Sequence, residues 1–92
     1  MYVVIFKAEI KELDDNYVNT ASKLRELAKS YGCTRFESFA TDKQEIALSY
    51  WPDLESIRRW GAGPEHQAAQ ALGKSTWYKH YTVEIAELSG KR

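Results

Sequence analysis

The chain has 92 residues, which is enough for one domain around a single hydrophobic core. Its 13 basic and 13 acidic side chains cancel and form no basic run, which argues against nucleic-acid binding because that affinity depends on neutralising phosphates. The single cysteine, Cys33, excludes an internal disulfide and favours a reducing compartment, so we expect one cytoplasmic domain spanning residues 1–92.

The first element expected is a β-strand at residues 2–11, where side chains alternate between two sets. One set is apolar throughout, whereas the other is apolar only at its first two positions, Val3 and Ile5. The apolar run is too short to span a membrane and lacks the basic leader and cleavage site of a signal peptide. We therefore expect no membrane partner.

An amphipathic helix of about four turns is expected next. After a polar break at residues 12–16, apolar side chains recur at helical spacing from Tyr17 to Tyr31. The break contains three candidate N-caps, among them Asp14. Gly32 is expected to end the helix as its C′ residue.

Two further strands are expected at residues 33–41 and 45–51. Only the polar residues 42–44 separate them, so the two strands should form an antiparallel hairpin. Alternation places three side chains of the second strand on one face and three on the other, namely Ala47, Ser49 and Trp51 against Ile46, Leu48 and Tyr50.

A broken helix is expected after this hairpin. Asp53 is a good N-cap for a short helix that contains Trp60, and the Gly-Ala-Gly run at residues 61–63 should interrupt it. Pro64 suits the first position of a second helical piece, and Gly73 is expected to end that piece.

Alternation returns at residues 78–88, which predicts a fourth strand, and residues 89–92 are expected to form a tail. The order of elements is β-α-β-β-α-β. This order predicts the ferredoxin-like α+β fold, a four-stranded antiparallel sheet with helices on one face and with the second helix broken. The opposite face would still carry apolar side chains, so we expect a homodimer in which sheet packs on sheet.

The stretch from residue 49 to residue 81 concentrates the aromatic side chains. It holds all three tryptophans, both histidines and three of the six tyrosines. Large amphipathic aromatics beside histidines are typical of the edge of a cavity. A packed aromatic core would have the same composition, and both interpretations stay open.

The same stretch resembles the C-terminal half of antibiotic biosynthesis monooxygenase domains. The resemblance rests on four marks, which are Ser49-Tyr50-Trp51, the segment from Trp60 to Pro64-Glu65-His66, Trp77-Tyr78, and Tyr81 leading into the last strand. It implies a dimeric α+β barrel with a cavity in each protomer between the sheet and the broken second helix. Members of this family include monooxygenases that oxidise polyphenolic aromatics without metal or flavin, and haem-degrading enzymes.

The catalytic residues that we expect are His66, Trp60 and Tyr81. His66 would lie in the first helical turn after Pro64, where free N–H groups disfavour an imidazolium and leave a neutral ring that can accept a proton. The resemblance implies that Trp60 lines the pocket, where its face would stack on a planar substrate. The structural alternatives are that His66 caps local backbone or lies at a subunit interface and that Trp60 is a core anchor.

Five further residues are expected to bind substrate, namely Ser49, Tyr50, Trp51, Trp77 and His80. Trp77 is interpreted mainly as a packing residue. Because side chains alternate along a strand, only one of His80 and Tyr81 can face a given cavity, and the same choice holds for Tyr50 and its two neighbours.

The function that we expect is a cofactor-independent monooxygenase acting on a small aromatic or quinoid compound, with no metal and no cofactor. The competing class is a non-catalytic dimer that binds a small hydrophobic ligand or acts in a stress response. A haem-degrading oxygenase is less favoured, because Gln70 stands where the haem-degrading enzymes have a histidine about ten residues after the tryptophan.

Overall fold

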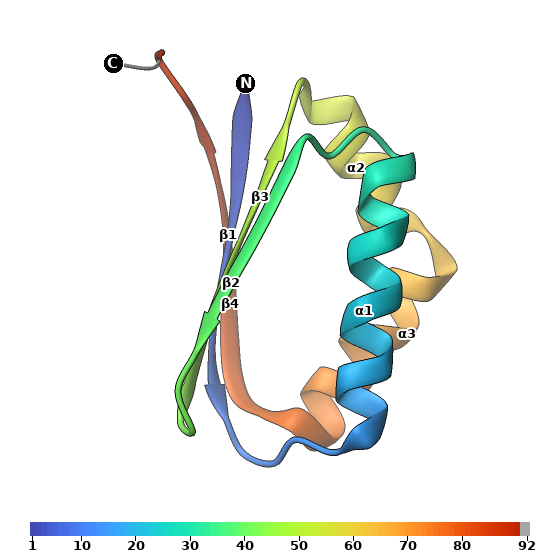
Figure 1. Ribbon diagram of the computed structural model, residues 1–92, viewed down its shortest axis with the longest axis vertical. Coiled ribbons are helices and arrows are strands. Elements are labelled where there is room, and N and C mark those ends of the chain that lie inside the picture. Colours follow the sequence, from blue (N-terminus) through green and yellow to red (C-terminus); the bar gives the residue numbers. More distant parts are fainter. Residues whose placement is uncertain (91–92) are drawn as a thin grey trace.

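The computed structural model describes residues 1–90 as a four-stranded antiparallel sheet with its helices on one face (Figure 1). The elements in chain order are β1 (Tyr2–Ile10), α1 (Asp15–Ser30), β2 (Arg35–Ala40), β3 (Gln44–Trp51), α2 (Leu54–Ala62), α3 (Pro64–Leu72), a π-helical turn (Gly73–Trp77) and β4 (Tyr78–Glu87). The strand order β2-β3-β1-β4 confirms the ferredoxin-like prediction. Of the tail expected at residues 89–92, residues 91–92 lie outside the described part of the chain.

Helix α1 begins and ends at the residues that the sequence indicated. The Asp14 carboxylate accepts a hydrogen bond from the backbone N–H of Tyr17 at 2.9 Å, which satisfies one of the free donors of the first turn. The same oxygen accepts the indole N–H of Trp77 at 3.2 Å, so the cap also ties α1 to the chain that enters β4. Gly32 follows the helix with φ of 114°, a conformation that favours glycine over other residues.

The hairpin of β2 and β3 is present, although β2 is shorter than the expected range 33–41. Thr34 lies outside the strand, but its backbone N–H still donates to the Tyr50 carbonyl at 2.8 Å. At the turn, the Thr41 hydroxyl accepts hydrogen bonds from the backbone N–H groups of Lys43 and Gln44 at 3.2 and 3.1 Å. These side-chain bonds close the connection within three residues and fix the register of the pair.

The break between α2 and α3 is narrower than the predicted interruption at residues 61–63. Helix α2 continues through Gly61 and Ala62, and only Gly63 leaves helical geometry, with φ of −66° and ψ of 148°. The cause is Pro64, because the ring of a proline disfavours helical ψ at the residue before it. One residue therefore sets the change of direction between the two helices.

Gly73 is the C-cap of α3, which ends at Leu72 as the sequence predicted. The Gly73 backbone is nevertheless helical, and the chain continues through the π-helical turn up to Tyr78. A Cβ atom at this position would lie 3.1 Å from the Tyr78 ring. The close approach of this aromatic ring therefore favours glycine here, because a Cβ atom would require the ring to shift by a few tenths of an ångström.

The core consists of two clusters near opposite ends of β1. One cluster is built around the fully buried Trp51 and contains Val4, Ala28, Ile57 and Trp60. The other contains Ala8, Ile10, Trp77 and Tyr78. Because these aromatic side chains come from both layers, they hold the sheet and the helices together at two separate places.

Apolar side chains lie at the centre of the sheet face without helices, as the sequence indicated. Val3 on this face is buried by its neighbours, whereas Phe39 and Ile46 are 61% and 40% exposed. Within residues 1–90, none of the helices has the length and hydropathy needed to cross a membrane.

The cap of α1 gives a first prediction. Replacing Asp14 with Ala removes an acceptor for two N–H groups and should lower the free energy of unfolding by about 1–2 kcal/mol, measured by urea denaturation. Asp14→Asn keeps an oxygen in place and should change it by less than about 0.5 kcal/mol. Equal losses in the two variants would show that the cap is not the source of the stabilisation.

Candidate active site

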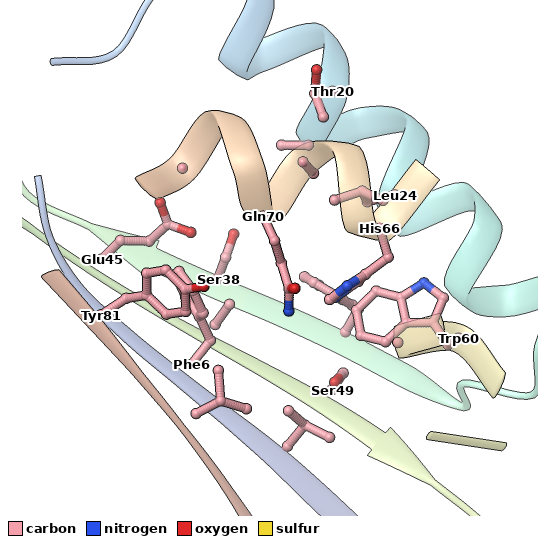
Figure 2. A pocket seen from close by; sticks show the side chains of 18 of the residues that line it. Phe6, Thr20, Leu24, Ser38, Glu45, Ser49, Trp60, His66, Gln70 and Tyr81 are labelled. Atoms are coloured by element: carbon pink, nitrogen blue, oxygen red, sulfur yellow. The ribbon is translucent and has the colours of Figure 1, made fainter. Parts of the chain in front are cut away.

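A cavity of about 300 Å³ lies between the sheet and the helices and is lined by residues of both core clusters (Figure 2). Small side chains form much of its surface, from the sheet Ser38, Ala47 and Ser49, and from the helical layer Ala21, Gly61, Ala69 and Gly73. Large aromatic side chains complete the wall, among them Trp60 at one end and Tyr81 at the other (Figure 2). A mostly apolar cavity with a few polar groups is the usual form of a small-molecule site.

His66 and Trp60 form one end of the cavity. Trp60 is in the last turns of α2 and His66 in the first turn of α3, and the bend at Gly63 brings their rings together at 4.5 Å between centroids and 66° between planes. Trp60 in turn packs on Trp51 at 5.1 Å. The buried Nδ1 of His66 and Nε1 of Trp60 have no hydrogen-bond partner within residues 1–90. An unpaired buried polar atom is costly, and such atoms often mark a functional site.

Burial lowers the pKa of His66 below its ordinary value of 6.5, because removal from water disfavours the charged imidazolium. His66 forms no ion pair within the described residues. The ring is therefore neutral at pH 7 and can accept a proton or a hydrogen bond from a bound molecule.

Ser49 and Trp51 of β3 both point to the helix side, but they differ in their access to the cavity. The Ser49 hydroxyl lines the cavity and accepts the indole N–H of Trp51 at 2.9 Å. Trp51 is fully buried and does not line the cavity. Its N–H occupies one acceptor position of Ser49, which leaves the Ser49 O–H as a donor toward a ligand.

Glu45 lies at the other end of the cavity, and sequence reasoning missed it. It is only 7% exposed, and one of its carboxylate oxygens accepts hydrogen bonds from the hydroxyls of Tyr17 and Tyr78, the latter at 3.1 Å. Burial and then the hydrogen bond to Glu45 raise the pKa of Tyr17. Burial and then the negative charge of Glu45 raise the pKa of Tyr78, so both phenols stay protonated donors.

Tyr81 and Trp77 also line the cavity near this end. The ring of Tyr81 packs against Phe6 at 5.4 Å and against Tyr78 at 6.1 Å between centroids. The Trp77 indole N–H is held by Asp14, and its ring meets Tyr17 edge-on at 5.2 Å. Trp77 therefore contributes its ring to the wall, while its polar atom bonds within the protein.

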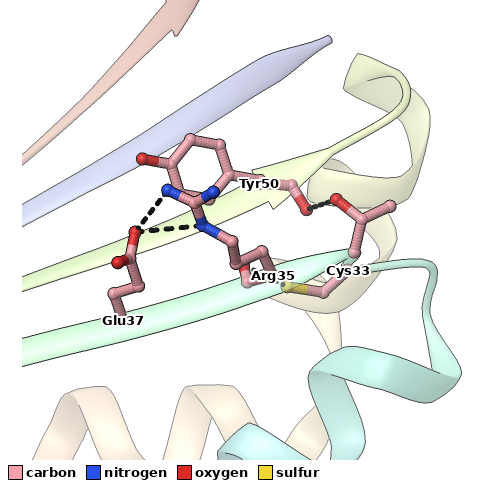
Figure 3. Close-up of polar contacts among 5 residues, drawn as sticks. Cys33, Arg35, Glu37 and Tyr50 are labelled. Atoms are coloured by element: carbon pink, nitrogen blue, oxygen red, sulfur yellow. Dashed lines mark hydrogen bonds and ion pairs between the residues drawn. The ribbon is translucent and has the colours of Figure 1, made fainter.

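Tyr50 and His80, like Trp51, are expected substrate-binding residues that do not line the cavity, and these two lie on the other face of the sheet. Both lie on the helix-free face, because their positions along β3 and β4 alternate with those that point to the helices. The Tyr50 ring stacks under the Arg35 guanidinium at 4.6 Å, and Arg35 pairs with Glu37 at 2.9 Å (Figure 3). His80 lies 2.9 Å from a carboxylate oxygen of Glu9.

Within residues 1–90, three or more His, Cys, Asp or Glu side chains nowhere come close enough together to hold a metal ion. The cavity instead contains one imidazole at one end and one carboxylate at the other.

Comparison with curated proteins gives two relatives. The chain is 37% identical over 93 aligned positions to the uncharacterized protein YqjZ of Bacillus subtilis (strain 168), covering 99% of this chain and 82% of YqjZ. It is 29% identical over 94 positions to jasmonate monooxygenase ABM of Pyricularia oryzae, covering 97% of this chain but only 44% of that protein. The chain matches no protein-family model.

Comparison with solved structures confirms the expected fold. A variant of SnoaB, a cofactor-independent oxygenase from Streptomyces nogalater, has a TM-score of 0.81 at 11% identity, covering 98% of this chain and 94% of SnoaB. An antibiotic biosynthesis monooxygenase has a TM-score of 0.76 at 16% identity, covering 98% and 100% of the two chains. The chain therefore has the antibiotic biosynthesis monooxygenase fold, as its motifs indicated.

The lowered pKa of His66 predicts a pH dependence of stability. The unfolded chain binds a proton at this residue near pH 6.5 and the folded chain only at lower pH, so the free energy of unfolding should fall as pH drops below about 6.5. Urea denaturation between pH 8 and 5 should show a smaller fall in His66→Gln than in the wild type, while the surface variant His80→Gln should keep the wild-type contribution of His66. Identical profiles for wild type and His66→Gln would contradict the assignment.

Proposed function

We propose, on the premise that the chain belongs to the same family as YqjZ of Bacillus subtilis, that the protein is a cofactor-independent monooxygenase acting on a small aromatic or quinoid compound. The observation that carries the proposal is the half-buried, neutral His66 packed against the Trp60 ring in a mostly apolar cavity. The fold shared with an oxygenase that needs no cofactor supports the same class of reaction. The single cysteine favours a reducing compartment, so we place this activity in the cytoplasm.

The reaction that we infer begins with proton transfer to His66. A phenol-rich substrate whose ring carries an acidic C–H group gives up that proton and becomes an electron-rich anion. The anion reduces dioxygen, one oxygen atom is retained in the product as a carbonyl group, and the other leaves as water. The balance is one CH₂ group and one O₂ converted to one C=O group and one H₂O, so no external reductant is required.

The other cavity residues suit the transition state of that reaction. The Trp60 ring offers a flat surface for an aromatic substrate, and the Ser49 hydroxyl is a donor toward a developing oxyanion. Apolar walls keep the local dielectric low, which strengthens these polar contacts. Tyr81, whose phenol ring also lines the cavity, would lie close to the substrate. The haem-degrading alternative has less support, because the amide of Gln70 points into the cavity at the corresponding place (Figure 2).

The site residues predict the effect of their removal on oxygen consumption. With hydroxylated anthrones or quinols as substrates, oxygen-electrode assays should show kcat/KM reduced by about 10²-fold or more in His66→Gln, because a general base contributes about 10²–10⁴-fold. Trp60→Phe should mainly raise KM. The control is Glu65→Gln, a change beside His66 on the exposed side of α3, which should leave the rate unchanged.

Two outcomes would contradict this prediction. Oxygen uptake by the wild type that is no faster than uptake by a Trp60→Phe, His66→Ala double variant would contradict the enzymatic proposal. Stable binding of the same compounds without oxygen consumption would instead favour the non-catalytic alternative, a dimer that binds a small hydrophobic ligand.

We propose further that the protein is a homodimer through its helix-free sheet face. The support is the group of apolar side chains there, which a single chain leaves partly exposed, namely Ile5, Phe39, Ile46 and Leu48. Polar pairs border this group, Arg35 with Glu37 on β2 and Glu9 with His80 across β1 and β4. An apolar centre within a polar rim is typical of a protein interface.

The dimer proposal predicts the effect of one charge. Leu48→Lys places an ammonium group at the centre of this face and should convert dimer to monomer, measured by sedimentation velocity at micromolar concentration. The control is Val18→Lys, since Val18 is 63% exposed on α1, on the helical side. A wild type that sediments as a monomer, or a Leu48→Lys variant that stays dimeric, would contradict the proposal.

A further inference from the structure

We propose that the Glu45 carboxylate binds the ligand by accepting a hydrogen bond from the hydroxyl group of an aromatic molecule. This contact makes the cavity select uncharged hydroxyarenes over aromatic carboxylates. The inference rests on the cavity of the proposed oxygenase and adds to it the charge and polarity of its substrate. It is carried by three features of that cavity, which are an unoccupied carboxylate oxygen, the charges of the wall, and the position of Glu45 relative to His66.

The first feature is the hydrogen bonding of Glu45. Both Tyr17 and Tyr78 donate to the same oxygen, Oε1. Within residues 1–90, the other oxygen, Oε2, receives no hydrogen bond. A carboxylate offers about four acceptor positions, so Oε2 remains able to accept a hydrogen bond from a further donor. Because Glu45 lines the cavity, a donor on a ligand bound there can reach Oε2 (Figure 2).

The second feature is the charge of the wall. No lysine or arginine is among the residues that line the cavity, and Glu45 takes part in no ion pair within the described chain. Arg25 bonds to the Ser38 hydroxyl at 2.9 Å and lies over the Phe36 ring, but it does not itself line the cavity. The cavity therefore carries a negative charge with no cation beside it, which repels an anionic ligand.

The third feature is the separation of the polar groups. Glu45 with its two tyrosines is at one end of the cavity and His66 with Trp60 at the other, with small and apolar side chains between them (Figure 2). A flat ligand lying along the cavity can direct an O–H group to Glu45 while its other end meets His66. Both tyrosines remain protonated and donate to Oε1, so they hold that oxygen in place and leave Oε2 open to the ligand.

The test is a calorimetric titration with three matched probes, namely 2-naphthol, 2-naphthoate and naphthalene, at pH 7 without oxygen. The wild type should bind 2-naphthol about tenfold or more tightly than either of the others, as expected for one hydrogen bond to a charged group. Glu45→Gln keeps the size of the side chain and an acceptor for the tyrosines but removes the charge. It should bring 2-naphthol and 2-naphthoate to within about threefold of each other.

Several outcomes would overturn the inference. They are equal binding of 2-naphthol and naphthalene by the wild type, tighter binding of 2-naphthoate, no binding of any probe, or an unchanged preference in Glu45→Gln. Should Glu45→Gln fail to fold, the wild-type ratios decide, together with Tyr17→Phe, which keeps the charge of Glu45 and should keep the rejection of 2-naphthoate. Preference for 2-naphthol without oxygen consumption from any quinol would refute the oxygenase proposal and leave this inference standing. Oxygen consumption without a preference for 2-naphthol would refute this inference and leave the oxygenase proposal standing.

Discussion

The spacing between the sheet and its helices is the constraint on which the rest of this structure depends. Trp51 and Trp60 set that spacing at one end, and Trp77 and Tyr78 set it at the other. Between these two places the wall includes several small side chains, among them Ala47, Ser49 and Ala69, which leave space that the larger lining residues do not fill. Protein cores are normally packed as densely as organic crystals. The cavity between the sheet and the helices therefore depends on the small side chains in its wall as well as on the spacing that the aromatic rings set.

The chemistry of the cavity depends on one bend in the backbone. Pro64 forces Gly63 out of helical geometry, and this single residue turns α3 relative to α2. The turn places His66 edge-on against Trp60, with the imidazole removed from water and without a charged partner. A straight helix through the same residues would separate the two rings by nearly two turns, since they are six positions apart. The helix break is thus the feature that combines a flat aromatic surface with a neutral base.

Alternation and capping residues predicted the elements and their order, because local signals such as Asp14, Gly32 and Pro64 act on the backbone within a few residues. Alternation alone could not decide which face of the last strand turns inward, and so could not choose between His80 and Tyr81. That choice depends on the pairing of β4 with β1, including the register shift between Glu9 and Ile10. Such long-range pairing cannot be predicted from the alternation of side chains within either strand.

Glu45 was missed for a related reason. A glutamate at the start of a strand is normally solvated, and its burial here depends on phenols from α1 and from β4, 28 and 33 residues away in the chain. The one available signal was that Glu45 lies on the same face of β3 as Ala47, Ser49 and Trp51, which point toward the helices. Residues chosen only for packing would place an apolar side chain at such a position, because a buried carboxylate stabilises a fold less than an apolar side chain of similar size. The presence of a carboxylate, supported by two tyrosines on one oxygen and open to the cavity on the other, is better explained by a ligand than by the fold.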